Sequence, residues 1–172
     1  MPVKTQVDRQ LGIPNFAVFF EIIDKLRKHK SNIALSSDFI VGFPEEDDRD
    51  FQETMDLIHH VGFMNSYSFK YSLRPGTPAA DREQIPKKIQ DDRLKIMQTT
   101  LDQQQIDFNK KFLSKRLEVL ISSSGKYKGQ VKGKSEFNQS VAIPGNPNII
   151  GDIVPVQITD ISVHSLIGKA EV

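Results

Sequence analysis

The chain has 172 residues, of which 38% are hydrophobic and 26% are charged, and its formal net charge is +1. These values are ordinary for a soluble globular protein, and they exclude a polycation or an acidic tail. No cysteine is present, which excludes disulfides, thiol nucleophiles and thiolate-held iron–sulfur or zinc sites within these residues. No apolar run approaches the roughly 20 residues of a membrane span, so we expect a cytoplasmic protein without a membrane anchor.

The charge is distributed unevenly along the chain. Residues 1–108 carry 14 basic and 17 acidic residues, whereas residues 109–172 carry 9 and 5. A modest positive field on a small C-terminal domain indicates nucleic-acid binding, with an ordinary solvated surface as the alternative.

The first part of the chain alternates helix-type and strand-type patterns. Apolar residues at a spacing of three and four indicate helices, and the alternation in SYSFKYS indicates a strand with two different faces. The expected elements are a loose arm over 1–15, a helix over 16–29, a strand over 32–43, a helix over 45–61 that begins with acidic residues, a strand over 66–72, a loop over 74–80 and a helix from Pro86 to about residue 113.

After residue 115 the pattern changes to short β-type runs separated by Gly, Ser, Asn and Pro. The runs begin at Arg116, Gly129, Gln139, Asp152 and Ser165. Five short strands in so few residues predict a small, closed or nearly closed β-barrel of the OB type. The fold class is therefore α/β followed by all-β, with a domain boundary near residue 113.

Several motifs occur together and in order. They are SSDFIVGFP at 36–44, YSFKYSLRPGTPAA at 67–80, GKS at 133–135, DIVPVQITD at 152–160 and SLIGKA at 165–170. Over roughly residues 20–172 the chain resembles the C-terminal part of the radical-SAM tRNA methylthiotransferases, and its last part resembles the TRAM domain with which that family grips tRNA.

This resemblance implies a partial radical-SAM (β/α) barrel over residues 16–113 and a five-stranded, OB-like TRAM barrel over 114–172. It implies methylthiolation of isopentenyl-adenosine beside the tRNA anticodon, with S-adenosylmethionine and iron–sulfur clusters as the family's cofactors. Because the chain has no cysteine, it cannot assemble the clusters itself. We expect either that a partner chain supplies the cysteine-bearing domains or that this chain does not catalyse the reaction. Glu45, Glu46 and Asp47 stand where the family usually has Gly-Glu-Thr.

In the family, the end of the first strand and the second strand bind S-adenosylmethionine. The residues that this resemblance singles out are Ser36, Ser37, Asp38, Ile40, Gly42, Phe43, Tyr71 and Ser72. Polar groups near a buried strand suit a ribose or a methionine head, and a glycine lets a flat ring approach the backbone. The alternative is a β–α turn that only reverses the chain, with an aromatic strand packed on a helix.

A second group of residues suits RNA. Lysines on a β-surface can neutralise phosphates, and an aromatic ring can stack on a base. The candidates are Arg74, Lys126, Tyr127, Lys128, Lys132, Lys134 and Asn138. The alternative is a lysine-rich hairpin that keeps the protein soluble, with Arg74 solvated. The scattered histidines and the acids of residues 45–50 predict no metal site.

Two strands with their helices cannot close a parallel barrel, so we expect unpaired edges and an exposed apolar face. Three hypotheses follow: a methylthiotransferase part that is active only with a cysteine-bearing partner, a non-catalytic module that binds tRNA, and a degraded gene product. The exposed face favours aggregation, self-pairing or a covering partner.

Overall fold

The computed structural model describes residues 16–171, so the arm expected over residues 1–15 lies outside the described part. The chain divides into two compact units after Leu101. The division falls within the helix α4, Lys87–Lys110, so the last turns of this helix belong to the second unit.

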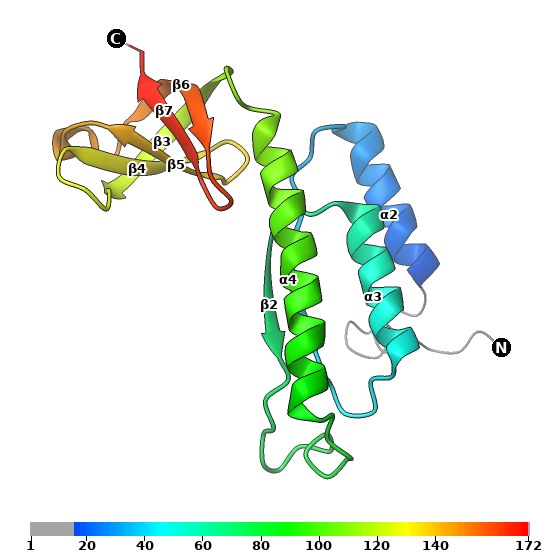
Figure 1. The fold of residues 1–172 in the computed structure, drawn as a ribbon. Helices are drawn as coiled ribbons and strands as arrows, with labels where there is room; N and C mark the ends of the chain where they lie inside the picture. The colour runs from blue at the N-terminus through cyan, green and yellow to red at the C-terminus, as the bar shows by residue number, and fades with distance from the viewer. Residues whose placement is uncertain (1–15, 172) are drawn as a thin grey trace. The chain divides into compact units, whose positions relative to one another are not determined.

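The first unit is a parallel β/α segment, as the sequence predicts (Figure 1). Its elements are α2 (Phe16–His29), β1 (Ser36–Val41), α3 (Asp48–Val61), β2 (Asn65–Lys70) and the first turns of α4. β1 and β2 form a two-stranded parallel sheet in which Asp38 is opposite Tyr67 and Ile40 is opposite Phe69. α3 is the crossover connection that a parallel pair requires.

The core of the first unit lies on one face of this sheet. Phe39 and Val41 of β1 point to that face and are buried. They pack with apolar side chains of the three helices, among them Ile23 of α2, Ile58 of α3 and Met97 of α4. Alternate residues of the same strands point to the opposite face.

The start of α3 differs from the expectation. The acidic run predicts a helix from Glu45, whereas α3 begins at Asp48. Asp47 is the N-cap residue and forms a capping box with Asp50. Glu45 has a φ of +68°, which is not helical, and Glu46 is buried. The acidic residues before the cap therefore shape a turn rather than complement the helix dipole.

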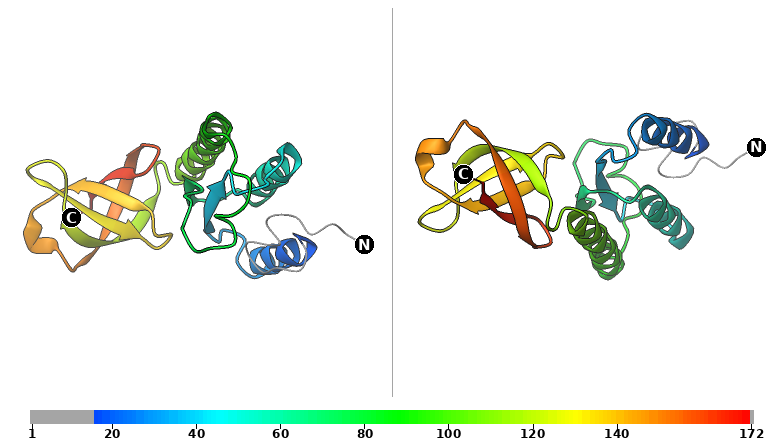
Figure 2. Two further views of the ribbon diagram at one scale, coloured as in Figure 1. Left: turned by 90° about the horizontal axis from the view of Figure 1, so that it is seen from below. Right: turned by 90° about the horizontal axis from the view of Figure 1, so that it is seen from above.

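The second unit is a closed five-stranded barrel, which confirms the predicted fold class (Figure 2). Its elements are β3 (Arg116–Ser124), β4 (Gln130–Ser135), β5 (Ser140–Pro144), the short 3-10 helix η1 (Pro147–Ile149), β6 (Ile153–Ile161) and β7 (Leu166–Ala170). The strand order is β3-β4-β5-β7-β6, β6 pairs with β3 to close the barrel, and only β5 and β7 pair in parallel.

Apolar side chains at alternate positions of the strands fill the interior of the barrel. Buried positions alternate with exposed ones along β3, so that Leu117, Val119 and Ile121 point inward. Val131 and Val141 are fully buried on β4 and β5. Closure leaves the barrel without free edges.

The end of α4 is built into this barrel. Asn109, which is 1% exposed, donates to the carbonyls of Ser162 and Val163 and accepts from Gln139 Nε2 at 2.7 Å. The rings of Phe112 and Phe137 lie 4.9 Å apart beside this network. Buried polar groups that are all paired in this way specify one position of the helix end against the strands.

Candidate nucleic-acid interface and cofactor-facing sheet

One face of the two-stranded sheet is exposed and partly apolar. Ile40, Tyr67 and Phe69 are 45%, 62% and 54% exposed. The register places them side by side with Asp38, and the Tyr67 and Phe69 rings are nearly parallel with centroids 6.5 Å apart. An aromatic and aliphatic surface with a carboxylate beside it suits a flat base and a cationic group.

A second pair of aromatic rings lies just beyond the ends of the strands. Phe43 follows β1 and Tyr71 follows β2, and their rings meet edge to face at 5.2 Å. The Tyr71 N–H donates to the carbonyl of Val41 at 2.8 Å, which continues the parallel ladder. The Tyr71 hydroxyl is buried and has no hydrogen-bond partner. Such a group is a feature that a ligand or a water would satisfy.

The turn after β1 is held by a buried ion pair that the sequence analysis did not predict. Glu46 accepts from the Gly42 N–H at 2.9 Å and from Arg93 Nη1 at 2.7 Å. Arg93 also donates to the Glu46 carbonyl and to Asp48. Burial raises the pKa of Glu46 above its ordinary value, and the Arg93 guanidinium opposes this rise. The network fixes the turn at the carboxyl end of β1.

Gly42 is required here by the chain's own packing. Its φ is +71°, which favours glycine, and a Cβ at this position would lie 2.4 Å from Gln90 Cγ of α4. Gln90 Nε2 in turn donates to the carbonyls of Gly42 and Ile85. The space against the Gly42 Cα is therefore taken by α4, which explains a glycine without any ligand.

The remaining candidates for the cofactor wall are spread over both faces. Ser36 and Asp38 are exposed on the same face as Ile40, whereas Ser37 is half-buried on the opposite face with Phe39. Ser72 is exposed in the chain after β2. The structure thus brings Asp38 and Ile40 together and groups Gly42, Phe43 and Tyr71 at the strand ends. Tyr67 and Phe69 join the first group, and their alternation with polar residues is the pattern that marks them.

The basic candidates on the barrel fall into two groups. Lys126, Tyr127 and Lys128 lie in the turn between β3 and β4, and all are exposed. Lys132 and Lys134 lie on the outward face of β4. They form one basic hairpin, which suits the phosphates of a nucleic acid.

Two further candidates lie away from this turn. Asn138, with a φ of +60°, is in the turn after β4, and its carbonyl accepts from Lys134 Nζ at 3.2 Å. Arg74 belongs to the first unit, where it is exposed in the loop after β2 and its carbonyl accepts from the Thr77 hydroxyl. Within the second unit, the structure therefore groups Asn138 with Lys134 of the basic hairpin.

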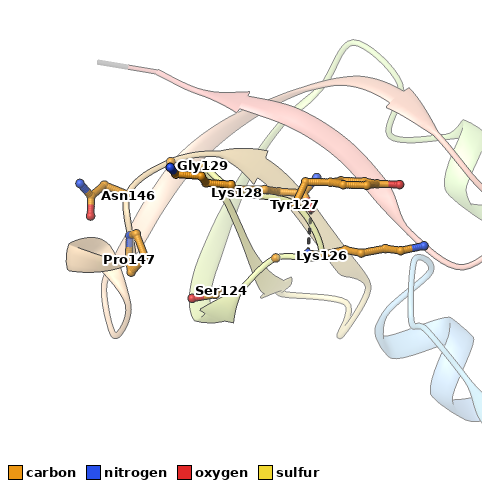
Figure 3. Close-up of a pocket in the computed structure, with 10 residues that line it drawn as sticks. Ser124, Lys126, Tyr127, Lys128, Gly129, Asn146 and Pro147 are labelled. Atoms are coloured by element: carbon orange, nitrogen blue, oxygen red, sulfur yellow. Dashed lines mark hydrogen bonds between the residues drawn. The ribbon is translucent and has the colours of Figure 1, made fainter.

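A pocket of about 700 Å³ opens beside this hairpin (Figure 3). Besides the turn residues, the pocket is lined by Asn146, which precedes η1, and by Pro147, which is the first residue of η1. Nothing in the local sequence marks these two residues as neighbours of Lys126 and Tyr127.

Two other classes of site have no support in the described residues. Within residues 16–171, no three His, Asp or Glu side chains converge in a way that could hold a metal ion. None of the helices in this range combines the length and the apolar character that crossing a bilayer requires.

The fold and the basic hairpin define the class of the second unit. The family description "TRAM domain" matches residues 110–170, which run from the end of α4 to the last strand of the barrel. Over 154 residues the chain is 47% identical to the tRNA-2-methylthio-N(6)-dimethylallyladenosine synthase of Rickettsia bellii (strain OSU 85-389) and 48% identical to that of Rickettsia prowazekii (strain Madrid E). The chain is homologous to the C-terminal portion of these synthases.

The match covers 88% of this chain but 34% of each of these two relatives. The chain thus spans about a third of the length of the curated relatives it matches. The matched stretch is much longer than the TRAM domain alone, so the relationship includes the β/α segment.

Proposed function

We propose that these residues form the tRNA-binding and cofactor-facing part of a tRNA methylthiotransferase that acts on isopentenyl-adenosine beside the anticodon. The observation that carries the proposal is the identity of 47% over 154 residues with a synthase whose name states this kind of tRNA modification. A tRNA substrate would place the protein in the cytoplasm.

In this proposal the TRAM barrel binds tRNA through its basic hairpin. Lys126, Lys128, Lys132 and Lys134 are exposed on adjacent parts of one hairpin. Each lysine that neutralises a phosphate releases counterions, so the affinity would fall steeply with salt. Arg74 is a further candidate for a phosphate contact, from the loop after β2.

The exposed sheet face serves in this proposal as a wall of the S-adenosylmethionine site. Ile40, Tyr67 and Phe69 would contact the adenine, and Asp38 would meet a polar part of the cofactor. The buried and unpaired hydroxyl of Tyr71 supports a ligand near the strand ends. When bound, S-adenosylmethionine supplies the radical chemistry of the family.

The described residues do not fit an iron–sulfur cluster. The 172 residues contain no thiolate donor. Cysteine ligands must therefore come from outside these residues, in the same polypeptide or in a partner chain. The contribution of this segment is then to bind tRNA and to complete the cofactor wall, rather than to hold the cluster.

Reconstitution tests the enzymatic part of the proposal. The chain is combined with the cysteine-bearing domains of the family under reducing, anaerobic conditions, and methylthio-adenosine in tRNA is measured by mass spectrometry. The proposal predicts product only when both components are present, and less product for Asp38→Ala. A stable complex that contains iron but yields no product would contradict it.

A second candidate function is a non-catalytic module that binds tRNA, and the closed TRAM barrel favours it because this unit needs no missing strand. Here tRNA binding is measured by fluorescence anisotropy over a range of salt. Replacing Lys126, Lys128, Lys132 and Lys134 together with alanine should weaken binding and flatten the salt dependence. Absence of wild-type binding at low salt would remove both functions.

A further inference from the structure

The pocket beside the basic hairpin is built from two loops that are distant in sequence. One is the turn between β3 and β4, which contributes Lys126, Tyr127 and Lys128. The other follows β5 and contributes Asn146 and Pro147. Figure 3 shows the Asn146 and Pro147 side chains on a segment separate from the one that carries Lys126.

Backbone hydrogen bonds hold the two loops in place. The Gly145 N–H donates to the Gly129 carbonyl at 2.9 Å and joins the loops directly. Within the turn, the Gly125 N–H donates to the Gln130 carbonyl at 2.7 Å, and the Lys126 N–H donates to Gln130 Oε1 at 3.1 Å. A pocket whose walls are already ordered loses little conformational entropy when a ligand binds.

The side chains of this pocket combine a ring with two cations. Tyr127 is 66% exposed, and Lys126 Nζ lies 5.7 Å from the centroid of its ring. Figure 3 shows these two side chains extending in the same direction. An exposure of 66% leaves much of the Tyr127 side chain accessible to a stacking partner. Lys128 adds a second exposed ammonium group.

Asn146 adds a polar group with a defined role. Its Oδ1 accepts from the Asn148 N–H at 3.1 Å, which orients the side-chain amide. The amide nitrogen is the group that remains to donate a hydrogen bond to a base or a phosphate oxygen. A ring for stacking, two ammonium groups and an oriented amide are the chemistry that recognises a nucleotide.

We propose that this pocket receives a single unstacked nucleotide of an RNA loop, with its base on Tyr127 and its phosphates at Lys126 and Lys128. The inference deepens and rests on the proposed tRNA binding. A volume of about 700 Å³ is far larger than a simple anion needs and lies within the range of pockets that bind small molecules. A base inside a duplex cannot use this site, because both of its faces are already stacked on neighbouring bases.

Two RNA probes of similar length test the inference by fluorescence anisotropy: a stem-loop with a seven-nucleotide loop, and a fully paired duplex. Tyr127→Ala should weaken binding of the stem-loop by roughly 5- to 100-fold and leave binding of the duplex unchanged. Tyr127→Phe retains an aromatic ring and should bind both probes as the wild type does. Asn146→Ala, at the other wall of the pocket, should also weaken the stem-loop selectively.

The matched control is the double change Lys132→Ala and Lys134→Ala on β4, outside the pocket. It should weaken both probes alike and lower the salt dependence, because it removes phosphate contacts only. Tyr127→Ala should leave the salt dependence as it is.

The outcomes separate this inference from the proposed function. If the wild-type chain binds both probes but Tyr127→Ala weakens both equally or neither, the pocket assignment is wrong and tRNA binding stands. If the wild-type chain binds neither probe at low salt, the pocket assignment and the proposed tRNA binding are both wrong.

Discussion

The carboxylate of Glu46 is paired with the guanidinium of Arg93 at 2.7 Å, and both side chains are less than a tenth exposed. The two residues lie in the turn after β1 and in α4, and they join elements that are far apart in the sequence. The same carboxylate accepts from the Gly42 N–H, so one ion pair sets the shape of the strand end.

Arg93→Met should destabilise the first unit by about 3 kcal/mol or more, because it leaves the Glu46 carboxylate buried without its partner. The loss is measured by urea denaturation followed by circular dichroism of the helices. Lys88→Met on the same helix is the control, since the Lys88–Asp92 pair is exposed and its loss should not be measurable. Equal stability of the two variants would show that the buried pair does not stabilise the unit.

The stability of the first unit should depend on pH through Glu46. Burial raises the pKa of this carboxyl above 4.5, so the folded protein keeps the proton to a higher pH than the unfolded chain does. The stabilisation that the protonated Glu46 carboxyl gives the folded state is therefore fully present below pH 4.5, and it is lost as the pH rises through the raised pKa. Glu46→Gln should lack this loss. The measurement is the difference in Tm between wild type and Glu46→Gln from pH 4 to 7, and a difference that does not change with pH would contradict the expectation.

Gly42→Ala should cost about 2–4 kcal/mol, because alanine is strained at a φ of +71° and its Cβ would clash with Gln90 Cγ. Gly76→Ala is the matched control: its φ is +81°, but nothing lies within 4 Å of the added Cβ, so only the conformational cost of about 1 kcal/mol remains. The double variant Gly42→Ala with Gln90→Ala should recover the steric part. Additive losses in the double variant would rule out the clash.

A fragment of residues 102–172 should fold cooperatively, whereas a fragment of residues 114–172 should be less stable by several kcal/mol or fail to fold. The shorter fragment lacks Asn109, so Gln139 loses a buried partner, and it lacks Phe112, which packs on Phe137. Thermal melts by circular dichroism compare the two. Identical melting curves would show that the helix end adds nothing to the barrel.

The exposed sheet face should make the 172-residue chain self-associate. The Phe69 side chain is 54% exposed. Phe69→Ser should therefore lower the self-association measured by sedimentation velocity without lowering Tm, because the ring has few buried contacts to lose. Tyr127→Ser on the barrel, 66% exposed, is the control and should leave association unchanged. A lower Tm for Phe69→Ser would mean that the ring stabilises the fold instead of forming an exposed contact surface.

Local pattern predicted most of the elements, though not the start of α3, and it predicted the small β-barrel of the second unit. Alternation of apolar and polar residues along the strands of the barrel depends only on the period of two of a β-strand, so the five strands were predicted from the runs that begin at Arg116 and Gly129 onward. The helical spacing in residues 87–110 depends in the same way on 3.6 residues per turn. The exposure of the lysines in the basic hairpin was also predicted, because charged residues in turns and on the polar face of a strand lie in solvent.

The tertiary structure decided which residues meet. Glu46 was expected in the first turn of a helix, and the position of α4 buries it against Arg93. The same helix fills the space at Gly42 with Gln90, and the antiparallel pairing of β4 with β5 brings Gly145 to Gly129 beside the pocket. Periodicity specifies the direction of a side chain within its own element, but the partner of that side chain depends on how elements distant in sequence pack. The sequence by itself therefore determined most of the elements and the alternation of buried and exposed residues along the barrel strand β3, and packing decided the buried ion pair, the glycine contact and the pocket.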